Sequence, residues 1–157
     1  MKYISILFLL TFPVFASEDH CVDIDVVGEE TQSCLIVPPG GKRFVLVDFS
    51  FITCGACVQN FPVLAEFAHE ISAQVAVNVV LFKHTHADNL AYIAEHPKWF
   101  EGHRIGLDQK NKQGKALGLQ YAPTMWLFER GKPEPIGQWI GVLGRSDKEE
   151  IKKLTAE

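Results

Sequence analysis

The fold of this chain is decided by residues 44–57, which read FVLVDFSFITCGAC. Phe44 to Phe49 predict a buried strand, because this short apolar run is rich in β-branched and aromatic side chains and contains a single acid, Asp48. From Val58 to Ser72, apolar residues recur at spacings of three and four, which indicates one face of a helix. Cys54 and Cys57 therefore lie where a strand ends and a helix begins.

Two thiols at this spacing suit thiol-disulfide exchange, because they can face each other and close a small ring. A helix N-terminus presents unpaired amide N–H groups and a partial positive charge, which favour a thiolate. The pKa of a cysteine in such a place can fall from roughly 8.5 to about 3.5–7.5. Cys54 lies nearest the positive end and is the expected nucleophile, and Cys57 would attack the mixed disulfide and release the substrate.

Length and composition indicate one globular domain. The chain has 157 residues, of which 47% are hydrophobic and 22% are charged, enough to bury a real core. Its formal net charge is −4 with histidine neutral. This acidic balance argues against nucleic acid or anionic membrane surfaces as partners.

Residues 1–16 predict a secretory signal peptide. Lys2 supplies a positive start, Ile4 to Ala16 is apolar, and Ala16 is the small residue that signal peptidase requires. As a helix this stretch would rise only about 20 Å, short of the roughly 30 Å of a bilayer core. We therefore expect export to the periplasm or cell envelope. An uncleaved membrane anchor is the alternative, and the membrane is a partner only in that case.

Residues 17–41 predict an N-terminal hairpin extension. Residues 22–27 alternate apolar and acidic side chains, residues 34–37 are the expected partner strand, and residues 28–33 the turn. If Cys54 and Cys57 are the redox pair, Cys21 and Cys34 are left for each other, in an exported chain where disulfides persist. Their bridge would close a loop of about 14 residues, worth roughly 3 kcal/mol. A second redox couple is the alternative.

Strand and helix patterns alternate through residues 42–157. This alternation predicts an α/β domain, a mixed sheet with helices on both faces. We expect one helix to be capped by Asp88 or Asn89, and the last helix to begin with a capping box of Ser146 and Glu149. The other expected strands are 75–82, 104–107, 124–128 and 136–140, with a short helix over 110–117.

Four separated features coincide with those of the thioredoxin fold. Asp48 stands six residues before Cys54, Cys54 and Cys57 match the active-site pair, Pro62 follows five residues later, and Ala122-Pro123-Thr124 precedes an apolar strand. Gly141 resembles the glycine after the last strand of that family. The chain thus resembles thioredoxin-fold thiol-disulfide oxidoreductases. The long stretch between Phe82 and Ala122, expected to hold an added helix and strand, makes it most similar to TlpA/ResA/CcmG-like envelope thioredoxins.

The resemblance implies a role for each matched residue. Asp48 would be buried and take the proton from Cys57, and Pro123 would be cis and face the cysteines. Ala122 would offer backbone groups to an extended substrate. Thr53, Gly55 and Ala56 would also contact the substrate. Thr53 stands where tryptophan is usual and Ala56 where proline is usual, so the resemblance leaves the substrate and the direction of exchange more open than the chemistry. The implied partners are protein disulfides and a DsbD-like membrane electron donor, with no cofactor.

Other functions remain open at this point. The chain is expected to be a reductase by analogy, and an oxidase or isomerase is the alternative direction. A copper or zinc chaperone would use Cys54 and Cys57 with His84 or His86, although no further ligand completes such a set. A non-catalytic interaction module is the third hypothesis.

Four other aromatic residues and one lysine can also be placed from the pattern. Trp126 and Trp139 are expected in the core. Trp99 and Phe100 could line a substrate-facing surface, and Lys83 could lie near Asp48.

Overall fold

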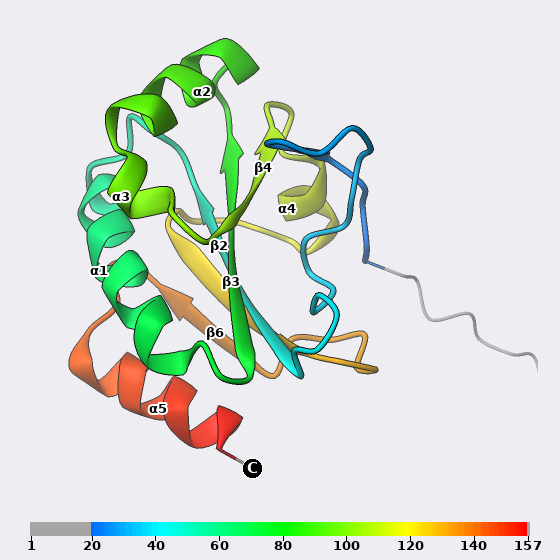
Figure 1. Cartoon of the computed structure of the whole chain (residues 1–157), viewed down its shortest axis with the longest axis vertical. Coiled ribbons are helices and arrows are strands. Elements are labelled where there is room, and N and C mark those ends of the chain that lie inside the picture. Colours follow the sequence, from blue (N-terminus) through cyan, green and yellow to red (C-terminus); the bar gives the residue numbers. More distant parts are fainter. Residues whose placement is uncertain (1–19, 157) are drawn as a thin grey trace, which may run out of the picture.

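The computed structural model describes residues 20–156 and contains a six-stranded sheet in the order β1-β4-β3-β2-β5-β6 (Figure 1). The predicted signal peptide lies outside the described residues. The strands are β1 Asp25–Val26, β2 Phe44–Ser50, β3 Val75–Phe82, β4 Arg104–Asp108, β5 Thr124–Glu129 and β6 Gly137–Ile140. The helices are α1 Gly55–Ile71, α2 His86–Glu95, α3 Pro97–Phe100, α4 Lys112–Ala116 and α5 Arg145–Thr155.

Strand β2 is the centre of the sheet, and all seven of its residues are buried. It pairs in parallel with β3 and antiparallel with β5. A strand with neighbours on both sides and cover on both faces is mostly apolar, which explains the run in the sequence, with Asp48 and Ser50 as its polar residues. The mixed α/β class predicted from the sequence is confirmed.

Each face of the sheet carries its own apolar cluster. On one face, α1, α3 and α5 pack against alternate residues of β2 and β3, around Phe61, Phe100 and Ile151. On the other face, the segment before β2 contributes Leu35 and Ile36, and the loop after α4 contributes Leu119. Figure 1 shows α4 and this N-terminal segment on the side of the sheet away from α1 and α5.

The N-terminal segment folds differently from the predicted hairpin. Its two arms meet at a single bridge, between Ile24 and Ser33. Strand β1 pairs instead with β4, and Leu35 and Ile36 are buried on the sheet without forming a strand. Asn78 on β3 holds this segment down, because its side-chain amide donates to the Leu35 carbonyl at 2.8 Å. The segment is therefore a cover for the sheet, and the predicted strand over 34–37 is wrong.

Both predicted helix caps are wrong by a few residues. The N-cap of α2 is Thr85, whose hydroxyl accepts the amide N–H of Asp88 at 3.1 Å while the Asp88 carboxylate accepts the Thr85 amide N–H. The N-cap of α5 is Gly144, whose N–H donates to the Asp147 carboxylate at 2.7 Å. In both cases an aspartate takes the place that glutamate holds in the usual capping box.

The aromatic side chains singled out in the sequence differ in burial. Trp126 and Trp139 are buried in the core as expected. Phe100 is buried too, with 4% of its surface exposed, so it does not line a substrate-facing surface. Trp99 stacks on the imidazole of His96 with ring centroids 4.2 Å apart.

We expect Leu35→Ala to lower the free energy of unfolding by about 2–5 kcal/mol, because Leu35 is fully buried between the N-terminal segment and the sheet. Urea denaturation followed by tryptophan fluorescence measures the loss. Val37→Ala is the matched control, since Val37 is 49% exposed and its truncation should change stability by less than about 0.5 kcal/mol. Equal effects of the two substitutions would contradict the assignment of this segment to the core.

Candidate active site

Cys54 and Cys57 form a disulfide at the start of α1, with Cα atoms 5.1 Å apart. Cys54 is the N-cap residue, and its sulfur accepts the amide N–H of Cys57 at 3.2 Å. The helix begins at Gly55, three residues earlier than the apolar pattern indicated. Cys54 is partly exposed, whereas Cys57 is fully buried. Only the first sulfur is therefore open to a visiting molecule.

The Ala122–Pro123 peptide bond is cis and lies beside the disulfide. The Cys54 sulfur is 3.6 Å from the Ala122 carbonyl oxygen, a contact without a hydrogen bond because a disulfide sulfur carries no proton. The pairing of β5 with β2 brings this loop there, since Thr124 stands opposite Phe49. Gly141 also holds the cis-proline loop in place, because its N–H donates to the Pro123 carbonyl at 2.9 Å. The φ of Gly141 is +93°, a value that favours glycine.

Asp48 is fully buried in the middle of β2. Alternate residues of a strand share a face, so Asp48 points to the same side as Leu46, which belongs to the cluster that contains Cys57. The Ser50 hydroxyl donates to one carboxylate oxygen at 2.6 Å, and the other oxygen has no hydrogen-bond partner among the described residues. Burial raises the pKa of Asp48 to about 7, against an ordinary 3.8. Near neutral pH this carboxyl can both take and give a proton.

The remaining predicted contact residues lie around the exposed sulfur. Thr53 and Gly55 are exposed and Ala56 is partly exposed. The Thr53 hydroxyl is hydrogen-bonded to Nε2 of His84 at 2.9 Å. Lys83 is exposed, and its ammonium lies 4.4 Å from the centre of the Phe51 ring, so its charge is placed beside Phe51.

Apolar side chains are exposed next to the cis-proline loop. Tyr121 is 61% exposed, and Ile140 and Val142 follow at 58% and 37%. They are neighbours because Ile140 pairs with Thr124 and Gly141 bonds to Pro123. An exposed apolar surface beside a reactive sulfur suits contact with the side chains of another polypeptide.

Cys21 and Cys34 form the second disulfide, with Cα atoms 5.7 Å apart. Gln113 at the start of α4 binds the same segment: its side chain accepts the Val22 N–H at 2.8 Å and donates to the His20 carbonyl at 2.7 Å. This disulfide lies with the cluster on the face of the sheet opposite to α1. The bridge and the glutamine together hold the start of the described chain onto the sheet.

The candidate metal ligands are not gathered. Within residues 20–156, no three histidine, cysteine, aspartate or glutamate side chains form a group able to hold a metal ion. His84 faces Thr53, whereas Nδ1 of His86 faces the Asp25 carboxylate at 3.6 Å. In the same part of the chain, no helix combines the length and apolarity needed to cross a bilayer.

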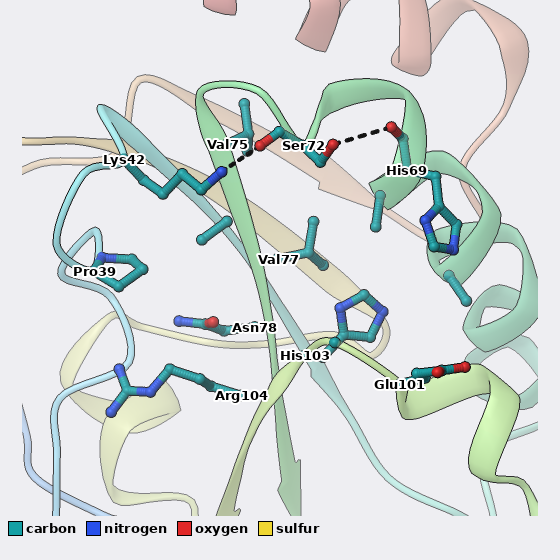
Figure 2. Close-up of a pocket in the computed structure, with 14 residues that line it drawn as sticks. Pro39, Lys42, His69, Ser72, Val75, Val77, Asn78, Glu101, His103 and Arg104 are labelled. Carbon is teal, nitrogen blue, oxygen red and sulfur yellow. Dashed lines mark hydrogen bonds between the residues drawn. The ribbon is translucent and has the colours of Figure 1, made fainter.

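A cavity of about 350 Å³ lies between α1 and the first half of β3 (Figure 2). Its cations have partners: the Lys42 ammonium donates to the carbonyl of Ser72, and Arg104 pairs with Glu29 at 2.8 Å. Burial lowers the pKa of His103 on its wall and so favours the neutral imidazole. The cavity is at the opposite end of β3 from the cysteines and is separate from their site.

The arrangement of strands and helices is shared with solved structures. StoA from Bacillus subtilis superposes with a TM-score of 0.65 and 19% identity, over 85% of this chain and 95% of that one. The chain has a thioredoxin fold. A Chlorobium tepidum protein assigned as thiol:disulfide interchange protein DsbE is 25% identical over 71% of this chain and 76% of that one, with a TM-score of 0.60.

A secreted disulfide oxidoreductase of Mycobacterium tuberculosis has a TM-score of 0.66 and 10% identity, over 90% of this chain and 98% of that one. No protein-family model and no curated protein matches the sequence. The expected resemblance to thioredoxin-fold thiol-disulfide oxidoreductases is confirmed.

Two site features were missed by the sequence analysis. Ser50 bonds to Asp48, and the signal was present, because residues two apart on a strand share a face. His84 was considered only as a metal ligand, and its bond to Thr53 depends on how two strands are aligned.

The raised pKa of Asp48 predicts a pH-dependent stability. Between about pH 4 and pH 7 the folded state holds a proton that the unfolded state has released. The contribution of Asp48 to the free energy of unfolding should therefore fall as pH rises through this range, by at most about 1.4 kcal/mol per pH unit, whereas buried His103 contributes with the opposite sign. Urea denaturation of the oxidised protein at several pH values measures the slope.

Asp48→Asn should flatten this slope, since asparagine cannot titrate. Asp147→Asn, at the exposed cap of α5, is the control and should leave the slope in place. Equal slopes in the wild type and in Asp48→Asn would contradict a buried, protonated Asp48.

Proposed function

We propose that this protein is an exported thiol-disulfide oxidoreductase that exchanges disulfides with protein substrates through Cys54 and Cys57. The observation that carries the proposal is the difference between the two sulfurs: Cys54 is partly exposed at the N-terminus of α1, and Cys57 is fully buried behind it. One sulfur can meet a client and the other is reserved for the second step.

The proposed reaction begins with the reduced protein. The Cys54 thiolate attacks a client disulfide, so that a mixed disulfide forms and the first client sulfur leaves as a thiolate. Asp48, with its pKa near 7, takes the proton of the Cys57 thiol. The Cys57 sulfur then attacks Cys54, and the second client sulfur leaves. The client gains two electrons, and takes up two protons, while Cys54 and Cys57 become the disulfide seen in the structure.

The surroundings of Cys54 support a polypeptide as the client. The Ala122 carbonyl lies next to the reacting sulfur and can accept an N–H from an extended backbone. Tyr121, Ile140 and Val142 offer apolar surface on the same side. We therefore assign substrate contact to Ala122 and to the exposed turn of Thr53, Gly55 and Ala56.

Cys54→Ser should reduce the rate of insulin reduction by dithiothreitol to the uncatalysed rate, because the attacking sulfur is gone. Cys57→Ser should instead accumulate mixed disulfides with the client, since no sulfur resolves them. Non-reducing gels and mass spectrometry detect these adducts. Full activity of the Cys54→Ser protein would refute the proposal, and adducts on Cys57 in that variant would reverse the roles of the two sulfurs.

We propose that the exchange runs in the reducing direction in the cell envelope. The proposal draws on the likeness to envelope thioredoxins and on residues 1–16, which carry the pattern of a signal peptide. A reductase outside the cytoplasm must receive electrons across the inner membrane, so a DsbD-like membrane donor is the proposed partner.

The equilibrium between the cysteine pair and glutathione tests the direction. A reductase should have a potential near that of thioredoxin, about −270 mV, whereas a strong oxidase would lie near the DsbA value of about −120 mV. Quantifying the oxidised fraction by alkylation and mass spectrometry across glutathione ratios gives the potential. A value at the oxidising end would overturn the direction and leave the exchange chemistry in place.

A further inference from the structure

His84 contacts the residue that precedes the nucleophile. Its Nε2 is 2.9 Å from the Thr53 hydroxyl oxygen, and Thr53 is followed directly by Cys54. The contact follows from the sheet: β2 and β3 pair with an offset of 31 residues, as in Ser50 with Leu81. Continued past the ends of both strands, the same offset places Thr53 opposite His84. The histidine is thus brought to the cysteine turn by the central strand pairing.

The turn that carries His84 is held on both sides. Lys83 has φ +76°, a left-handed conformation that residues other than glycine seldom adopt, and its N–H donates to the Gln109 carbonyl at 3.1 Å. The buried Asn89 donates from its side chain to the His84 carbonyl at 3.3 Å. Such strain is retained where the surroundings fix it, and here it sets the position of one imidazole.

No carboxylate among the described side chains holds the His84 ring, so a charge on the ring would act on the cysteine turn. The nearby charged groups are Lys83, whose ammonium lies over the Phe51 ring, and Asp88 on α2. The Asp88 carboxylate is already hydrogen-bonded, because it accepts the Thr85 hydroxyl at 2.6 Å. The first turn of α1 contains no acidic residue. Among the described side chains, the hydrogen bond of the His84 ring is therefore to Thr53 and no carboxylate holds it.

We propose that His84 is a positioning residue that stabilises the thiolate of Cys54 through Thr53 when its imidazole is protonated. In the neutral form the Thr53 hydroxyl can donate to Nε2. In the protonated form Nε2–H must donate to Thr53, which frees the hydroxyl proton, and a positive charge is added beside the N-terminus of α1. Cys54 then stays ionised, and reactive, in mildly acidic surroundings.

This inference rests on the proposed function and is tested with one variant and its neighbour. In a Cys57→Ser background, with the Cys21–Cys34 bridge intact, Cys54 is the single free thiol of the chain. The ultraviolet absorbance of its thiolate is followed over a pH series. At about pH 5.5, His84→Gln should lower the ionised fraction roughly fivefold, and above about pH 8 the two curves should meet.

His86→Gln is the matched control, because His86 is two residues away and faces Asp25. Its curve should coincide with that of the parent, and Thr53→Val should shift like His84→Gln. Coincident curves for His84→Gln and the parent, or an equal shift in the His86 control, would overturn the role of His84. Insulin reduction by the unmutated protein is measured alongside, so that failure of the proposed function is seen separately.

Discussion

The enclosure of β2 between β3 and β5 is the constraint on which the rest of the structure depends. Every side chain of β2 is buried, and this fixes the register of the strand. A shift by one residue would move Asp48 to the opposite face of the sheet and put Val47 where Asp48 now lies. The fixed register determines where the chain leaves the sheet, and four residues separate the end of β2 from the start of α1. The cysteine at that junction is therefore placed by the packing of the core.

The same enclosure produces the chemistry of Asp48. A carboxyl group surrounded by apolar side chains, with one hydroxyl donor and one unpartnered oxygen, keeps its proton to near neutral pH. At high pH the ionised carboxylate destabilises the folded protein, because one hydroxyl hydrogen bond replaces the water that would solvate the charge. In the reaction that we propose, Asp48 accepts one proton when Cys57 reacts, and the raised pKa suits this step because a carboxylate of ordinary pKa would be a weaker base.

The sequence predicted the elements whose signal is local and left out those that depend on distant pairing. The run of β2, the apolar spacing of α1 and the position of Pro123 are each readable over a few residues. Strand β1 has two residues and pairs with β4, some 80 positions later in the sequence. The pattern of apolar residues in β1 does not indicate which strand it pairs with. The capping boxes were missed for another reason: Thr85 with Asp88 is a readable pattern, but aspartate replaces the usual glutamate.

The two cysteines differ in exposure because of where the helix places them. Both border the Gly55-Ala56 pair, yet the first caps the helix and meets solvent, while the second lies one turn inside against the core. Helix polarity acts mainly on the first sulfur, and the buried carboxyl lies on the side of the second. In the function that we propose, a single junction between a strand and a helix thus separates the sulfur of attack from the sulfur of release, and the His84–Thr53 contact acts on the first of these two steps.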